Sequence, residues 1–67
     1  MHAVDDARRL GSAMNHQADI WYRQGRLEEG KAEAIRALET FEKLGATADL
    51  SVSRNILRRI ERAIERR

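Results

Sequence analysis

A chain of 67 residues forms one small domain at most, and it buries only about 60% of the surface that it exposes when unfolded, so its core is marginal. Because there is no Cys, disulfides, thiolate catalysis and Cys-ligated zinc are excluded, and no apolar run reaches the ~20 residues of a membrane span. The formal net charge is +2, but residues 50–67 carry six Arg against two Glu, so the C-terminal segment is the basic part of the chain.

The first predicted element is an amphipathic helix over residues 4 to 24. Asp5 and Asp6 suit its first turn, where negative charge meets the positive end of the helix dipole, and a start of this kind is not a signal peptide. Gly11 weakens the helix by about 1 kcal/mol relative to Ala, so an end or a kink there is an alternative. Steps of four and three define the face expected to be buried, with one polar member: Ala3, Ala7, Leu10, Met14, Gln17 and Trp21.

Gly25 interrupts the helical pattern and predicts a tight corner, because glycine enters the left-handed region without steric cost. The second helix is expected over residues 27 to 44, with Gly45 as its stop. Its small residues favour a close approach to the first helix: Gly30, Ala34 and Ala37. The two helices are therefore expected to form an antiparallel hairpin, with Trp21 buried between them and Tyr22 exposed or in a groove.

A third helix is expected over residues 48 to 65, with Thr47 or Asp49 as its cap. Its charged face carries arginines spaced by four, with Glu61 and Glu65 close enough for helical ion pairs: Arg54, Arg58, Arg62 and Arg66. Its apolar face is formed by Leu50, Ile56, Leu57, Ile60, Ala63 and Ile64. The sequence thus predicts an all-α single domain, a helical hairpin plus a third helix.

A weak internal repeat with a period of 40 relates the first and third helices: Leu10 to Leu50, Asn15 to Asn55 and Ile20 to Ile60. Residues 13–45, half of the chain, resemble a tetratricopeptide repeat in its longer form of about 40 residues per unit. The residues that carry this resemblance are Ala13, Asn15, Ala18, Trp21, Gln24, Gly25, Leu27, Ala34, Ala37, Leu38 and Phe41 to Gly45. Gln17 stands where the family usually has Leu, and Gly30 where it usually has Ala.

The resemblance implies a helical solenoid fragment whose first and third helices line a groove for a peptide or a partner protein, the third helix being a cap. By position, the groove-lining set includes Ser12 and Val52, and the partner-binding residues are Asn15, Asp19, Tyr22, Arg23, Asn55, Arg59 and Arg62. With the two helices side by side, Asp19 and Arg59 occupy equivalent positions, and we expect them to form an ion pair across the groove.

Two of these features have alternative interpretations. Asn15, Asp19 and Arg23 are spaced by four, and this polar row either binds a peptide or is an ordinary solvated helix face. The arginines of the third helix are best explained as the polar outer face of a capping helix; contact with nucleic acid or with an acidic partner is the alternative.

The sequence offers no catalytic or metal-binding arrangement. His16 has no second strong ligand at helical spacing, Glu28 and Glu29 point in different directions, and no glycine-rich phosphate loop or Ser-His-acid arrangement is present. We therefore expect no enzymatic activity, no cofactor and no metal.

We expect a non-enzymatic protein–protein interaction module, a fragment of a larger repeat protein, in the cytoplasm; the nucleus is the alternative location. The alternative is a helical bundle that self-associates, because repeat units cannot bury their apolar faces alone. A nucleic-acid binder is a weaker third hypothesis, and a membrane is not an expected partner.

Overall fold

Three consecutive α-helices make up the fold. The computed structural model describes residues 3–67, with side chains described from Asp5 onward. The helices are α1 (Ala3–Arg23), α2 (Leu27–Leu44) and α3 (Thr47–Glu65), and residues 3–67 contain no strand. The predicted all-α class is confirmed.

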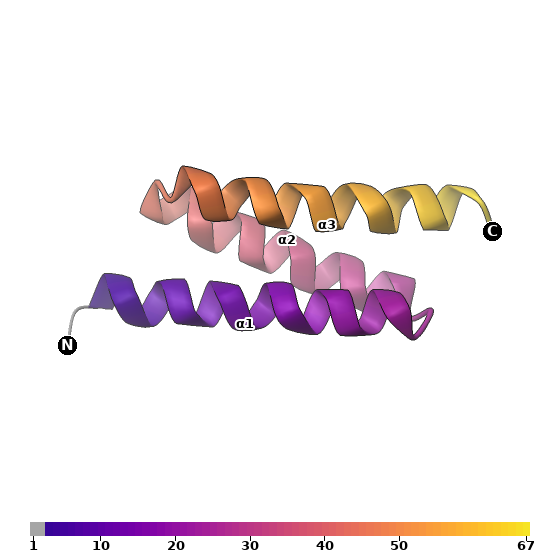
Figure 1. The fold of residues 1–67 in the computed structure, drawn as a ribbon, viewed down its shortest axis with the longest axis horizontal. Coiled ribbons are helices and arrows are strands. Elements are labelled where there is room, and N and C mark those ends of the chain that lie inside the picture. The colour runs from indigo at the N-terminus through magenta and orange to yellow at the C-terminus, as the bar shows by residue number, and fades with distance from the viewer. Residues whose placement is uncertain (1–2) are drawn as a thin grey trace.

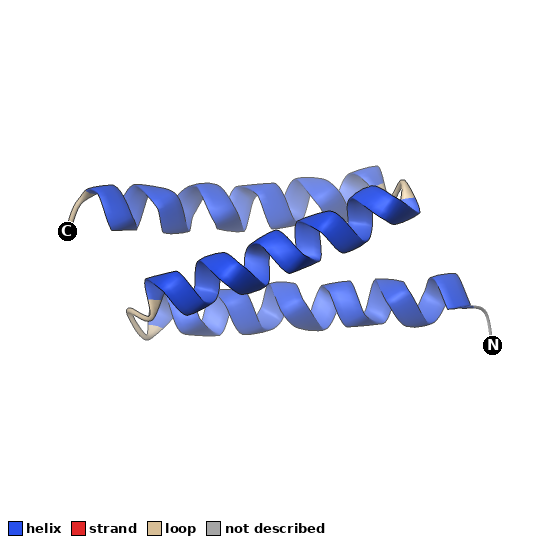
Figure 2. Ribbon diagram, turned by 180° about the vertical axis from the view of Figure 1, so that it is seen from behind, coloured by secondary structure: helices blue, strands red, loops and turns tan. Residues whose placement is uncertain are grey.

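The helices form two layers of an elongated molecule measuring 43 × 18 × 13 Å. α1 and α3 run side by side in the same direction, and α2 runs back across both of them (Figures 1 and 2). One face of the α1–α3 pair is therefore covered by α2, whereas the other face is turned to solvent.

Glycines in the left-handed conformation end the first two helices. Gly25 has φ +80° and Gly45 has φ +67°. After each glycine the next backbone N–H reaches back to the carbonyl five residues earlier, Arg26 to Trp21 at 2.8 Å and Ala46 to Phe41 at 3.0 Å. This is the Schellman arrangement, and it confirms that Gly25 folds the chain back on itself.

The core lies where α2 contacts both neighbours. Ala18, Leu27, Ala34 and Ile60 form its centre, and Tyr22 is among the half-buried residues packed around it. Phe41 is fully buried in α2, and the row of small residues predicted on α2 is buried as expected. Small side chains at these contacts allow the helix axes to approach closely.

The buried face of α1 differs from the predicted face by one residue. The buried positions are Gly11, Asn15 and Ala18, whereas Leu10 remains 55% exposed and Trp21 is only half-buried. One residue is a rotation of about 100° around the helix axis. The reason is steric, because the Phe41 ring lies where a Cβ of residue 11 would be, 2.6 Å from the ring atom Cζ.

Gly11 therefore accommodates a side chain of α2, and α1 does not end there. Gly11→Ala is expected to destabilise the fold by about 1–2 kcal/mol, because overpacking outweighs the ~1 kcal/mol gain in helix propensity. In a Phe41→Leu background, which removes the obstructing ring, the same substitution is expected to stabilise. Urea unfolding of the four proteins checks this, and destabilisation by Gly11→Ala in both backgrounds would contradict it.

The residues matched by the 40-residue repeat lie in different environments. Asn15 is buried and Asn55 is exposed, while Ile60 is fully buried and Ile20 is half-buried. Three helices do not by themselves distinguish a tetratricopeptide unit from another bundle, so the family resemblance stays a prediction.

Candidate functional site

The seam between α1 and α3 is held by two polar contacts. Near the start of both helices, Arg8 forms an ion pair with Asp49, with Nη2 and Oδ2 3.1 Å apart. Further along, the Ser53 hydroxyl donates a hydrogen bond to Oδ1 of Asn15 at 2.7 Å. Together these contacts fix α3 beside α1 in one register.

Asn15 was expected to face a partner, but the structure places it inside the molecule. Its side chain is only 9% exposed and meets Ser53, which is fully buried. Because a buried polar group needs a hydrogen-bond partner, the pair specifies how α3 docks on α1. Asn15 is therefore a structural residue of the seam.

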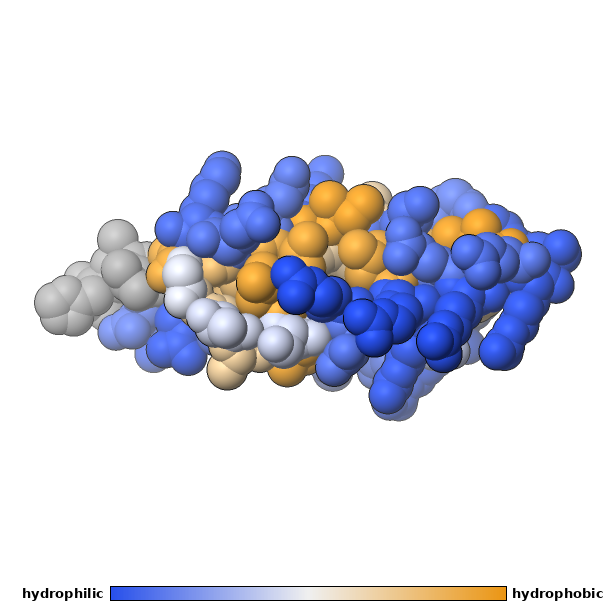
Figure 3. Space-filling model, turned by 90° about the horizontal axis from the view of Figure 1, so that it is seen from above, coloured by the Kyte–Doolittle hydropathy of each residue, from blue (hydrophilic) through white to orange (hydrophobic). Residues whose placement is uncertain are grey.

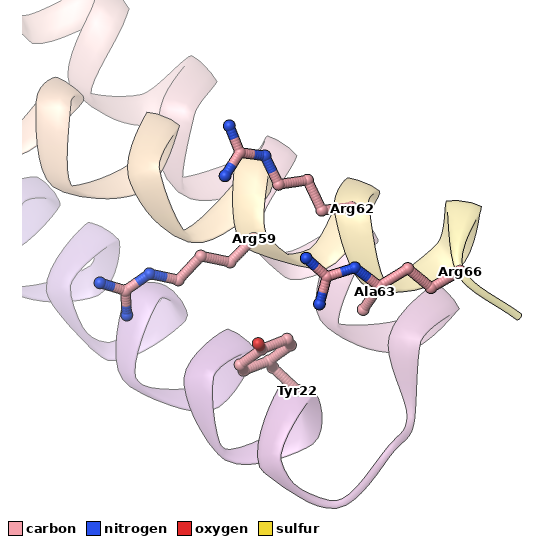
Figure 4. A pocket seen from close by; sticks show the side chains of 5 residues that line it. All are labelled: Tyr22, Arg59, Arg62, Ala63 and Arg66. Carbon is pink, nitrogen blue, oxygen red and sulfur yellow. The ribbon is translucent and has the colours of Figure 1, made fainter.

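A hollow of about 300 Å³ lies at the other end of the seam, and we call it the basic hollow. It is lined by Tyr22 from α1 and, from the C-terminal part of the chain, by Arg59, Arg62, Ala63 and Arg66. Figure 4 shows the Tyr22 ring between the guanidinium groups of Arg59 and Arg66, whereas Arg62 extends away from the ring. The three arginines are exposed, and Tyr22 and Ala63 are half-buried.

The arginines of the basic hollow have no acidic partner within residues 5–67. The five ion pairs of this region involve Arg8, Arg23, Arg26, Arg36 and Arg67. The helical ion pairs expected for Glu61 and Glu65 are not among them. Figure 3, which looks onto the molecule from above α3, shows the most hydrophilic side chains gathered toward the C-terminal end. Unpaired arginines make this end electropositive.

Three of the predicted partner-binding residues, Tyr22, Arg59 and Arg62, meet at the basic hollow. The others lie elsewhere. Asp19 pairs with Arg23 at 3.1 Å, so the expected ion pair between Asp19 and Arg59 is not formed in the described structure. Asn55 is exposed on α3 and does not line the hollow.

Two lining residues, Ala63 and Arg66, were not predicted as site residues. Helical periodicity could have found Arg66, because it follows Arg59 by seven residues and so lies on the same face of α3. Ala63 falls between them, and its small side chain leaves room for the Tyr22 ring. For Ala63, the only sequence signal is its position between Arg59 and Arg66 on the same helix.

A second hollow, of about 400 Å³, lies along the first turns of α1. The described residues that line it carry both charge signs: Asp5, Arg8, Arg9 and Ser12. Mixed charges give no preference for one class of ligand. The basic hollow is therefore the stronger candidate for a site.

The C-terminal residue contacts the start of α2. Arg67 forms an ion pair with Glu28, and its hydrogen bond lowers the pKa of Glu28 below the ordinary value. Because the folded pKa is lowered, the pair favours folding at neutral pH, and this contribution is lost as the pH falls through the folded pKa. Both side chains are largely exposed, so the effect is small.

Removing the Arg67 side chain should therefore change the pKa of Glu28 and have little effect on stability. Arg67→Ala is expected to raise the pKa of Glu28 toward its ordinary value, as measured by NMR titration of the Glu28 carboxyl carbon. Arg66→Ala removes the same charge next to it and is expected to leave this pKa nearly unchanged. An equal upward shift in both variants would show that the effect is general charge and not the Arg67 contact.

No group of three or more His, Asp or Glu side chains is placed to hold a metal ion among the described residues. None of the described helices is long and apolar enough to cross a membrane.

Comparison with known proteins adds no relative. No protein-family model, no curated protein and no solved structure matches this chain.

Proposed function

We propose that this chain is a non-enzymatic protein-interaction module that binds an acidic peptide segment of a partner protein at the basic hollow. The observation that carries the proposal is the set of three arginines that line the hollow together with Tyr22, none of them paired with an acid in the described structure. Guanidinium groups bind carboxylates in a forked geometry, so an acidic side chain is the natural counterpart.

The composition of the hollow also favours a peptide. Tyrosine and arginine are the residue types most often responsible for binding energy at protein interfaces. The Tyr22 ring is half-buried against the core, so it is held in place before a partner arrives. A partner therefore loses little freedom of this residue on binding, which favours affinity.

The resemblance to the tetratricopeptide repeat supports the same proposal from a different direction. That family uses the side of its first helices for peptide recognition, and here α1 and α3 lie side by side with their common face uncovered by α2. Asp19, Arg23 and Asn55 lie on these two helices and would contribute as surrounding polar contacts.

Fluorescence anisotropy with a labelled glutamate-rich peptide and its glutamine counterpart tests the proposal. The acidic peptide should bind, with an affinity that falls between about 0.05 and about 0.5 M salt because the contacts are screened. Replacing Arg59 and Arg66 by Gln should weaken binding, whereas the charge-matched control with Arg54 and Arg58 replaced by Gln should bind nearly as well. Equal loss of affinity in both double variants would show that binding depends on the general positive charge of the chain and not on the basic hollow. That result would overturn the proposal.

Self-association is a second candidate, favoured by one observation. Leu10 on α1 and Val52 on α3 are the large apolar side chains most exposed among the described residues, at 55% and 50%. Sedimentation velocity over a wide range of concentration should then show a dimer that Leu10→Ser weakens. A monomer at every concentration would exclude this candidate.

A short DNA duplex that outcompetes the acidic peptide would instead favour nucleic acid as the partner.

A further inference from the structure

We infer that the anion recognised at the basic hollow is the phosphoryl group of a phosphorylated serine or threonine, in an extended peptide with an apolar residue three positions away. The inference rests on the proposed function and makes its ligand more specific. Three features support it: the number of donors, the charge of the hollow and the position of Val52.

The donors around Tyr22 exceed what one carboxylate can accept. Arg59 and Arg66 can each present a fork of two N–H groups, and these four donors already match the roughly four acceptor positions of a carboxylate. The Tyr22 hydroxyl is a further donor at the hollow, and Arg62, whose side chain extends away from the ring, also lines it. A phosphoryl group brings three terminal oxygens and can satisfy the whole set.

The charge of the hollow leads to the same ligand. Its described lining carries three guanidinium groups and no carboxylate. On α1, the acidic Asp19 lies one turn before Tyr22 and is paired with Arg23 at 3.1 Å. A phosphorylated side chain carries about −1.5 to −2 charges near pH 7, against one for Glu, so it compensates more of the positive charge.

Val52 supplies an apolar contact at a defined distance from the arginines. Val52, Arg59 and Arg66 are spaced by seven residues and so share one face of α3, and Val52 is half exposed. Seven helical residues span about 10.5 Å. In the polyproline II conformation, residues three apart lie on the same side of a peptide and about 9.3 Å apart. An apolar residue three positions from a phosphorylated residue held beside Arg59 can therefore reach Val52.

The test uses labelled peptides of the sequence Gly-Leu-Gly-Gly-X-Gly-Gly with the whole 67-residue chain. X is phosphoserine, glutamate or serine, and a fourth peptide has phosphoserine with Leu moved next to it. The phosphoserine peptide should bind about tenfold more tightly than the glutamate peptide, as expected for a second charge and an additional oxygen. Moving Leu should weaken binding several-fold.

The pH dependence separates a phosphoryl group from a carboxylate. Affinity for the phosphoserine peptide should rise as the pH increases through about 6, where the second phosphate proton is lost. The described lining holds Tyr22, Ala63 and three arginines, and it contains no His, Asp or Glu. The glutamate peptide should show no such rise.

Variants locate the two contacts on the protein. Arg59→Gln should reduce affinity for the phosphoserine peptide by about tenfold, the loss expected when a charged hydrogen-bonding partner is removed. Arg58→Gln removes the same charge from a residue outside the hollow and should change the affinity for the phosphoserine peptide by less than about twofold. Val52→Ser should weaken the Leu-containing peptides and leave a peptide with Gly in place of Leu unchanged.

The outcomes distinguish this inference from the proposed function. Equal binding of the phosphoserine and glutamate peptides would overturn the inference and leave the acidic-peptide site in place. Binding of neither peptide, together with no binding of the glutamate-rich peptide, would overturn both. Tight binding that Arg58→Gln weakens as much as Arg59→Gln would also overturn the inference, because the hollow would then not be the site.

Discussion

Replacing Phe41 by Ala is expected to leave the chain largely unfolded at 25 °C. Phe41 is 0% exposed, and its ring occupies the space left free by Gly11 in α1. Removing a buried aromatic ring costs about 3–5 kcal/mol, and a chain of 67 residues has only about 3–10 kcal/mol of stability in total. The substitution therefore consumes most or all of that stability.

Circular dichroism at 222 nm with thermal and urea unfolding measures this effect. Leu10→Ala is the matched control, since it removes a large apolar side chain that is mostly exposed, and it should shift the urea midpoint only slightly. A cooperative transition of Phe41→Ala close to that of the unchanged chain would show that the contact between α1 and α2 is not what holds the hairpin together.

Ile60→Ala is expected to destabilise the fold by about 2–5 kcal/mol and to disorganise the basic hollow. Ile60 is fully buried in the core cluster and is the member of that cluster that α3 contributes. Its Cδ1 lies 3.2 Å from the position that a Cβ on Gly30 would take, so α3 docks directly against the small residues of α2. Without it, Arg59 and Arg62 lose their fixed position relative to Tyr22.

Ile20 provides the comparison, because it is the counterpart of Ile60 in the 40-residue repeat and is only half-buried. Ile20→Ala should cost roughly half as much as Ile60→Ala, in proportion to the apolar area that each buries. Urea unfolding and anisotropy with the glutamate-rich peptide measure stability and binding together. Equal destabilisation by the two substitutions would mean that Ile20 and Ile60 are structurally equivalent, which would contradict their different burial in the structure.

Much of the fold follows from local chemistry that is visible in the sequence. Gly25 and Gly45 end the first two helices because glycine adopts the left-handed conformation of a helix C-terminus without steric cost. Both glycines have a positive φ in the structure. The predicted second helix has the observed bounds, and the first and third differ from the observed ones by a residue at one end or both. Such short-range rules depend only on neighbouring residues.

The rotation of α1 could not be predicted in the same way. The large apolar side chains of Leu10 and Trp21 suggest one face, but the contact with α2 uses the face with Gly11 and Ala18. That choice depends on the Phe41 ring, thirty residues away in sequence. Because steric fit between helices overrides the local hydrophobic pattern, periodicity alone gave a face displaced by one residue.

Only part of the candidate site could be predicted from the sequence. Tyr22, Arg59 and Arg62 were expected at a groove because of the resemblance to the tetratricopeptide repeat, and the structure brings these three residues together. The role of Asn15 was missed, because its burial depends on how α3 packs beside α1 and brings Ser53 against it. The pairing of Asp19 with Arg23 is local and was available from their spacing of four.

The central claim is that Tyr22 of α1 and the arginines of α3 form one anion-binding surface. The most direct test follows the arginine Nε–Hε NMR signals while the phosphoserine peptide is added to the chain. We predict that the signals of Arg59 and Arg66 shift with saturation, together with the Tyr22 ring, while those of Arg54 and Arg58 stay in place. Uniform small shifts of all α3 arginines, or shifts confined to α2, would contradict the claim.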